Sequence, residues 1–150
     1  MKNPSIHTAR GIAATWRVAR QVAARLPNGG VVALQGELGA GKTTFVQGLA
    51  RAIGVARPVT SPTFTLVGEY AGAHQRLVHM DLYRLHAPDD LLAIGFGEYV
   101  ESGALVAIEW SERAGDLIPA TAVRVTIELT PDIRTRRITV HHPVAGNPAA

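Results

Sequence analysis

Residues 36–44 carry the feature that most constrains the fold, a glycine-rich segment that reads Gly-Glu-Leu-Gly-Ala-Gly-Lys-Thr-Thr. It matches G-x-x-x-x-G-K-[ST], the P-loop (Walker A) pattern, which requires a strand before it and a helix after it. Residues 31–35 form an apolar, β-branched run, and residues 45–53 repeat apolar side chains at helical spacing before Gly54, a helix stop. The chain is therefore predicted to contain a strand–loop–helix unit that binds nucleotide phosphates.

The residue types in this segment are those that phosphate binding needs. Gly36, Gly39 and Gly41 allow the backbone to bend so that successive N–H groups point at the phosphates. The amino terminus of the following helix adds a partial positive charge. Lys42 can reach the β- and γ-phosphates, and the Thr43 hydroxyl is placed to bind Mg²⁺.

Composition narrows the class of protein. The 150 residues include no cysteine, which excludes disulfides, thiol catalysis and cysteine-bound metals. A net charge of +3 is weak evidence for nucleic-acid binding, since bound nucleotide phosphates would also use it. The chain has no run of about 18 apolar residues, as a membrane span needs, and its first residues lack the apolar stretch of a signal peptide. We expect a cytoplasmic protein that does not bind membranes, with one domain over residues 1–143 and a disordered tail over 144–150.

Two strand-like segments end on a carboxylate. Residues 76–81 end at Asp81, and the apolar run that starts at Ala104 ends at Glu109. Ligands of open α/β sheets bind beside the carboxyl ends of strands, so both residues are candidates for binding Mg²⁺ or orienting an attacking water. The alternative is that one of them is only a helix cap or a surface charge, and residue chemistry alone does not rank the two.

The remaining patterns predict an α/β fold with a mixed sheet and antiparallel hairpins. A helix is expected over residues 9–26, with an apolar face made of Ile12, Trp16, Ala19, Ala23 and Leu26. Residues 55–63 contain two prolines and predict an extended loop, whose hydroxyl groups either reach the γ-phosphate or satisfy the turn backbone. Further elements are expected as a hairpin of residues 64–70 and 76–81, a short helix from Pro88, a helical element capped by Ser111, and a hairpin of residues 122–130 and 134–142. In the second hairpin Leu129 is expected to share the inward face, and Arg134, Arg136 and Arg137 are either solvated charges or include one that touches the nucleotide.

These motifs together resemble the TsaE (YjeE) family, small P-loop ATPases of tRNA threonylcarbamoyladenosine (t6A) biosynthesis. The P-loop alone is shared by a large superfamily. The more specific features are three segments in matching order and spacing: Thr60-Ser61-Pro62-Thr63-Phe64-Thr65-Leu66, His79-Met80-Asp81-Leu82-Tyr83-Arg84-Leu85 and Ile108-Glu109-Trp110.

The resemblance implies roles for individual residues. Thr43 and Glu109 would bind Mg²⁺, and Asp81 would be a carboxylate that supports the metal or the attacking water. Trp110 would matter in the switch region. The residues implied to contact ATP are Gly39, Ala40, Gly41, Lys42, Thr43 and Thr44 in the P-loop, Ser61 and Thr63 in a loop that senses the γ-phosphate, Thr15 near the adenine, and Arg137 late in the chain.

The resemblance also implies partners. The family works with TsaB and TsaD, which transfer a threonylcarbamoyl group to adenosine 37 of tRNAs that read ANN codons. The TsaE protein itself would hydrolyse ATP, weakly when alone, and would reset the complex between turnovers, so tRNA would be an indirect partner. Two alternatives are open: a small-molecule kinase on a P-loop fold, and a nucleotide-dependent binding module that barely hydrolyses ATP.

Overall fold

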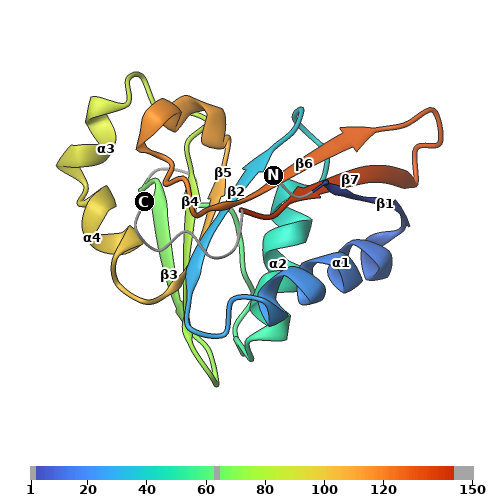
Figure 1. The fold of residues 1–150 in the computed structure, drawn as a ribbon, viewed down its shortest axis with the longest axis horizontal. Helices are drawn as coiled ribbons and strands as arrows, with labels where there is room; N and C mark the ends of the chain where they lie inside the picture. Colours follow the sequence, from blue (N-terminus) through green and yellow to red (C-terminus); the bar gives the residue numbers. More distant parts are fainter. Residues whose placement is uncertain (1–2, 63–64, 144–150) are drawn as a thin grey trace.

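A mixed β-sheet runs through the part of the chain that the computed structural model describes, residues 3–62 and 65–143 (Figure 1). Its strand order is β1-β7-β6-β2-β5-β4-β3. The strands are β1 (Ser5–Arg10), β2 (Gly30–Gln35), β3 (Val67–Ala71), β4 (Arg76–Asp81), β5 (Leu105–Glu109), β6 (Val123–Leu129) and β7 (Thr135–His141). The helices are α1 (Ile12–Ala24), α2 (Lys42–Ala52), α3 (Asp89–Ala93), α4 (Phe96–Val100) and the 3₁₀-helix η1 (Ser111–Leu117).

The four central strands, β6, β2, β5 and β4, are parallel to one another. Every residue of β5 is buried, as expected for a strand covered on both faces. The outer strands β3, β7 and β1 pair antiparallel with their neighbours. In the parallel register of β4 and β5, Asp81 lies opposite Glu109, so both carboxylates lie at the same edge of the sheet.

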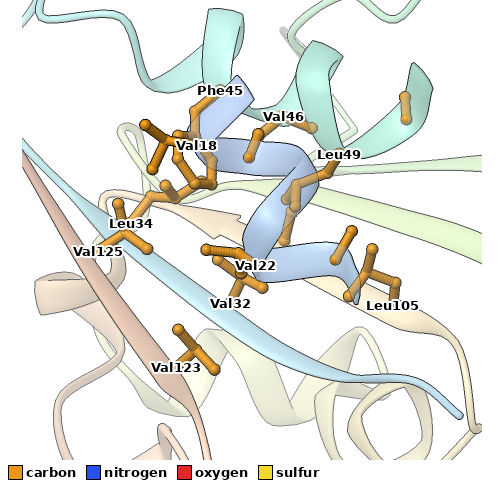
Figure 2. Close-up of a cluster of buried hydrophobic side chains, with 14 of the residues drawn as sticks. Val18, Val22, Val32, Leu34, Phe45, Val46, Leu49, Leu105, Val123 and Val125 are labelled. Carbon is orange, nitrogen blue, oxygen red and sulfur yellow. The ribbon is translucent and has the colours of Figure 1, made fainter. Parts of the chain in front are cut away.

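Helices cover both faces of the sheet, with α1 and α2 on one side and α3 and α4 on the other (Figure 1). Because side chains alternate along a strand, each central strand contributes to two cores. Figure 2 shows the core under α1 and α2, which includes Val18, Val32, Leu34, Phe45 and Leu49. The second core lies under the other helices and includes Met80, Leu91, Phe96, Ile108 and Ala114.

The structure confirms the predicted fold class. The P-loop lies between β2 and α2, and residues 55–62 form no helix or strand. The first predicted hairpin is present as β3 and β4, the second as β6 and β7, and the short helix after Pro88 is α3. No helix within these described residues has the length and apolar character that crossing a membrane requires. The predicted tail, residues 144–150, lies outside the described residues.

The amino-terminal prediction was wrong in two respects. The helix begins at Ile12, not at residue 9, because residues 5–10 form the edge strand β1, and Gly11 with φ 83° separates the two elements. Its buried face also differs. Ile12 is 59% exposed, whereas the buried residues are Thr15, Val18, Ala19, Val22 and Ala23.

Two smaller expectations also fail, and one element was missed. Ser111 does not cap a helix: Trp110, with φ 55°, precedes η1, and no side chain caps it. Leu129 is 47% exposed, because the inward alternation of β6 ends at Ile127. The short helix α4, which was not predicted, begins after Gly95 in the left-handed conformation.

Candidate functional site

The P-loop backbone has the conformation that its glycines were expected to permit. Gly41 has φ 110° and Gly39 has φ 80°, a region that side chains rarely adopt. At Gly36 space is the constraint, because a Cβ there would lie 2.5 Å from the Ile127 carbonyl oxygen. Helix α2 is 11 residues long and starts at Lys42, so its amino terminus directly follows the loop.

Lys42 is buried beneath this loop, with 5% of its surface exposed. Its Nζ donates to the carbonyl oxygens of Gly36 at 2.5 Å and Glu37 at 3.0 Å, and lies 4.0 Å from the centroid of the Trp110 ring. Burial lowers the pKa of Lys42, and the carboxylates of Glu109, Glu112 and Asp81 oppose this shift without cancelling it. Phosphate oxygens placed beside this ammonium group would favour its charged form.

Thr43 and Glu109 meet at the carboxyl end of β5. The Thr43 hydroxyl donates to the Glu109 carboxylate, at 3.0 Å from Oε1 and 2.9 Å from Oε2. Glu109 is only 3% exposed. On its other side, His79 Nε2 lies 2.5 Å from Glu109 Oε2. A hydroxyl and a carboxylate next to the P-loop are hard oxygen donors, so this pair fits the chemistry of Mg²⁺.

Asp81 lies opposite Glu109 and is tied to the loop of residues 55–62. Ser61 Oγ donates to Asp81 Oδ2 at 2.5 Å, and the backbone N–H of Tyr83 donates to Oδ1 at 3.0 Å. A movement of Ser61 would therefore directly change the hydrogen bonding of the Asp81 carboxylate.

One open pocket collects most of the predicted phosphate and metal residues. Its wall residues are Leu38, Gly39, Gly41, Lys42, Thr43, Thr44, Ser61, Asp81, Tyr83, Glu109 and Trp110. The structure thus brings the P-loop, Ser61 of the loop of residues 55–62 and both carboxylates together. Thr63 lies outside the described residues.

Among described residues, no group of three or more His, Cys, Asp and Glu side chains could hold a metal. A Mg²⁺ held by Thr43 and Glu109 would therefore take further ligands from phosphates and water, which is the usual way that proteins bind this ion.

A second pocket adjoins the P-loop on the side of α1. It is lined by Gly11, Ile12, Thr15, Gly39, Ala40, Gly41, Thr44, Ile133, Arg134 and Arg136. The predicted residues Thr15 and Ala40 are therefore in one place, where Ile12 and Ile133 provide exposed apolar surface. Such a mixed lining beside a phosphate loop suits a purine base.

Arg137 does not line this pocket, whereas its neighbour Arg136 does. Arg136 Nε donates to the Ala40 carbonyl oxygen at 2.9 Å, and its Nη1 donates to the carbonyl oxygen of Ile133 at 2.7 Å. Arg137 is exposed and lies next along β7, where successive side chains point to opposite faces. Of the two arginines, only Arg136 therefore contacts the P-loop.

Two residues of the site were not predicted. His79 lies two positions before Asp81 on β4 and therefore on the same face of the strand. That spacing was a signal available from the sequence, although the partner of His79 was not. Arg136 was considered only as one of three arginines.

Comparisons with known proteins match most of the chain to one family. The family model described as "Threonylcarbamoyl adenosine biosynthesis protein TsaE" matches residues 9–138. A tRNA threonylcarbamoyladenosine biosynthesis protein TsaE from Treponema pallidum is 44% identical over 115 residues, which span 77% of this chain and 84% of that protein. The protein of the same name from Bacillus subtilis is 36% identical over 118 residues, spanning 79% of this chain and 73% of that protein.

A solved structure is similar to this chain in both sequence and fold. A crystal structure of Bacillus subtilis YdiB superposes with a TM-score of 0.80 at 31% identity, covering 98% of this chain and 89% of that chain.

Proposed function

The chain belongs to the TsaE family of threonylcarbamoyl adenosine biosynthesis proteins, and we propose that it performs its accessory role in tRNA t6A formation by Mg²⁺-dependent hydrolysis of ATP. One observation carries the proposal: the first hydroxyl after the P-loop lysine, that of Thr43, is hydrogen-bonded to Glu109 at the end of the neighbouring strand β5. A hydroxyl and a carboxylate in this relation to a P-loop are the parts that hold Mg²⁺ in P-loop NTPases.

The phosphates would bind in the bend of the P-loop. Backbone N–H groups from Gly39 to Thr44 and the amino terminus of α2 favour negative charge there. Lys42 supplies a positive charge, and its Nζ donates to the carbonyl oxygens of Gly36 and Glu37. Binding would exchange these carbonyl contacts for phosphate oxygens.

Thr43 and Glu109 would hold Mg²⁺, which when bound would neutralise charge on the phosphate oxygens. Asp81, in register with Glu109, would accept a hydrogen bond from the attacking water or support the metal. Ser61 contacts Asp81 and would link the state of the γ-phosphate to the loop of residues 55–62, with Thr63 as a further hydroxyl of that loop.

The second pocket would take the adenine. Thr15 on α1 lines it, and Arg136 fixes the adjoining P-loop carbonyl from β7. Arg136 therefore replaces Arg137 as the late arginine that we assign to nucleotide binding.

The partners that we propose are homologues of TsaB and TsaD. In this scheme those proteins carry out the threonylcarbamoyl transfer, tRNA is met through them, and the ATP cycle of this chain returns the complex to its starting state. The chain itself is an ATPase and not the transferase.

The test is Mg²⁺-dependent ADP release, measured with and without a purified TsaB–TsaD pair. We expect weak turnover alone and stimulation by the pair. Lys42→Ala should strongly weaken ATP binding because it removes the phosphate-contacting charge, whereas Glu109→Ala should retain part of the binding and lose turnover. Glu98→Ala, which removes an exposed carboxylate on α4, is the matched control and should behave as wild type.

Each alternative has a distinct result. ADP formation that depends on a small-molecule acceptor, with a phosphorylated product, would indicate a kinase. ATP-dependent association with the pair that persists in Glu109→Ala, with no turnover in wild type, would indicate a binding module. Turnover that is unchanged in Glu109→Ala would overturn the metal assignment.

A further inference from the structure

A buried histidine lies directly behind the candidate metal ligand. His79 on β4 is fully buried, and its Nε2 is 2.5 Å from Oε2 of Glu109. The contact follows from strand pairing: His79 lies opposite Ala107, and Glu109 is two residues further along β5 on the same face. Val78 and Met80, the neighbours of His79, face the opposite core. His79 is thus the polar member of a strand that is otherwise apolar from Leu77 to Met80.

The hydrogen-bond partners of the ring indicate which nitrogen carries the proton. Nε2 faces a carboxylate oxygen, which accepts a hydrogen bond when it is ionised. Nδ1 is buried, and no described residue is within hydrogen-bonding reach of it. A proton on Nδ1 would be a buried donor without an acceptor, which proteins avoid. The arrangement therefore favours a ring with its proton on Nε2, donating to Glu109.

We propose that His79 is a positioning residue that fixes the Glu109 carboxylate for Mg²⁺, an inference that rests on the proposed function. Glu109 is held between two donors, the Thr43 hydroxyl on the P-loop side and His79 on the sheet side. A glutamate side chain has several rotatable bonds, and burial alone does not select one orientation of its carboxylate. The hydrogen bond from His79 on β4 selects one orientation of the carboxylate, so that Glu109 and Thr43 face each other before a metal binds. Hydrogen bonds to metal-binding carboxylates serve this purpose in many sites.

Two substitutions separate positioning from packing. His79→Leu fills much of the same space without a donor, whereas His79→Gln keeps an N–H group that can reach a carboxylate. Met80→Leu is the matched control, because Met80 is equally buried on the next position of β4 but faces the other core.

The experiment measures the affinity of a non-hydrolysable ATP analogue as a function of Mg²⁺ concentration, together with the melting temperature of each variant. For His79→Leu we expect the Mg²⁺ concentration at half-maximal effect to rise about 10- to 100-fold, the usual result of losing a partner of a metal ligand. The affinity for the analogue without Mg²⁺ should stay at the wild-type value. His79→Gln should recover most of the Mg²⁺ response, and Met80→Leu should keep all of it.

The outcomes distinguish this proposal from the proposed function. A normal Mg²⁺ response in His79→Leu overturns the positioning role, and so does an equal loss of affinity with and without Mg²⁺, which indicates a structural role. If wild type itself shows no Mg²⁺ response, the proposed function fails and this inference with it. Nitrogen-15 NMR of the wild-type histidine rings gives a test that needs no variant: a His79 ring protonated on Nδ1 alone refutes the proposal.

Discussion

Replacing Gly48 by alanine should push α1 and α2 apart at the point where they cross. A Cβ at Gly48 would lie 2.7 Å from Ala19 Cβ and 3.0 Å from two atoms of Trp16, Cα and Cδ1. Carbon atoms in contact prefer a separation of roughly 3.5–4.0 Å, so the helices would have to separate by about 1 Å at this point. Two of the three obstructing atoms are Ala19 Cβ and Trp16 Cα, which cannot rotate away.

The size of the effect is the sum of two opposing contributions. Overpacking a well-packed core costs about 1–3 kcal/mol of unfolding free energy. Alanine in a helix is more favourable than glycine by about 1 kcal/mol, which offsets part of that loss. Gly97→Ala isolates the second contribution, since Gly97 lies in α4 and a Cβ there would meet no atom within 4 Å. The difference in unfolding free energy between the two variants is therefore the steric contribution, about 1–3 kcal/mol.

Urea denaturation of wild type and both variants measures that difference. We expect Gly97→Ala to be at least as stable as wild type and Gly48→Ala to be less stable than Gly97→Ala by the amount above. Gly48→Ala should also bind ATP more weakly, because Thr15 and Thr44, one helical turn before Ala19 and Gly48, line the predicted base pocket. Equal stabilities for the two variants would refute the close helix crossing.

Replacing Arg136 by methionine should lower the unfolding free energy by about 1.5 kcal/mol, because a charged donor to a P-loop carbonyl is lost. Arg137→Met should change the unfolding free energy by less than about 0.5 kcal/mol. Equal losses in thermal denaturation would contradict the assignment of the inward arginine. In a Trp16→Phe variant, ATP should change the fluorescence of Trp110, because Lys42 Nζ lies 4.0 Å from the centroid of that ring and would move toward the phosphates. A constant emission at saturating ATP would show that the lysine does not move.

The sequence was sufficient where a motif or an alternation acts locally. The strand, loop and helix around Lys42, the buried strand that ends at Glu109 and the two hairpins all follow from patterns within a few residues. Residues 5–10 were missed as a strand because β1 is an edge strand with only Ala9 buried, so it lacks an apolar alternation. The buried face of α1 was also misplaced, because Ile12 lines the open pocket beside the P-loop instead of the core.

The details of the site depend on pairing between distant segments, which no local pattern records. His79 finds Glu109 only through the register of β4 with β5. Arg136 and Arg137 differ by one position, and the pairing of β7 with β6 decides which of them points at the P-loop. A shift of one residue in that register would exchange their roles.

The pairing of β1 with β7 has a consequence for the order in which the protein folds during synthesis. Ser5 pairs with Val140 and Arg10 with Thr135, so the first strand has no partner until the last strand has left the ribosome. The pocket beside α1 draws its walls from both of these regions, with Gly11, Ile12 and Thr15 on one side and Ile133 and Arg136 on the other. A nascent chain that already contains the P-loop would thus lack part of the wall of this pocket. This pocket would be complete only after the hairpin of β6 and β7 has formed and β1 has joined it.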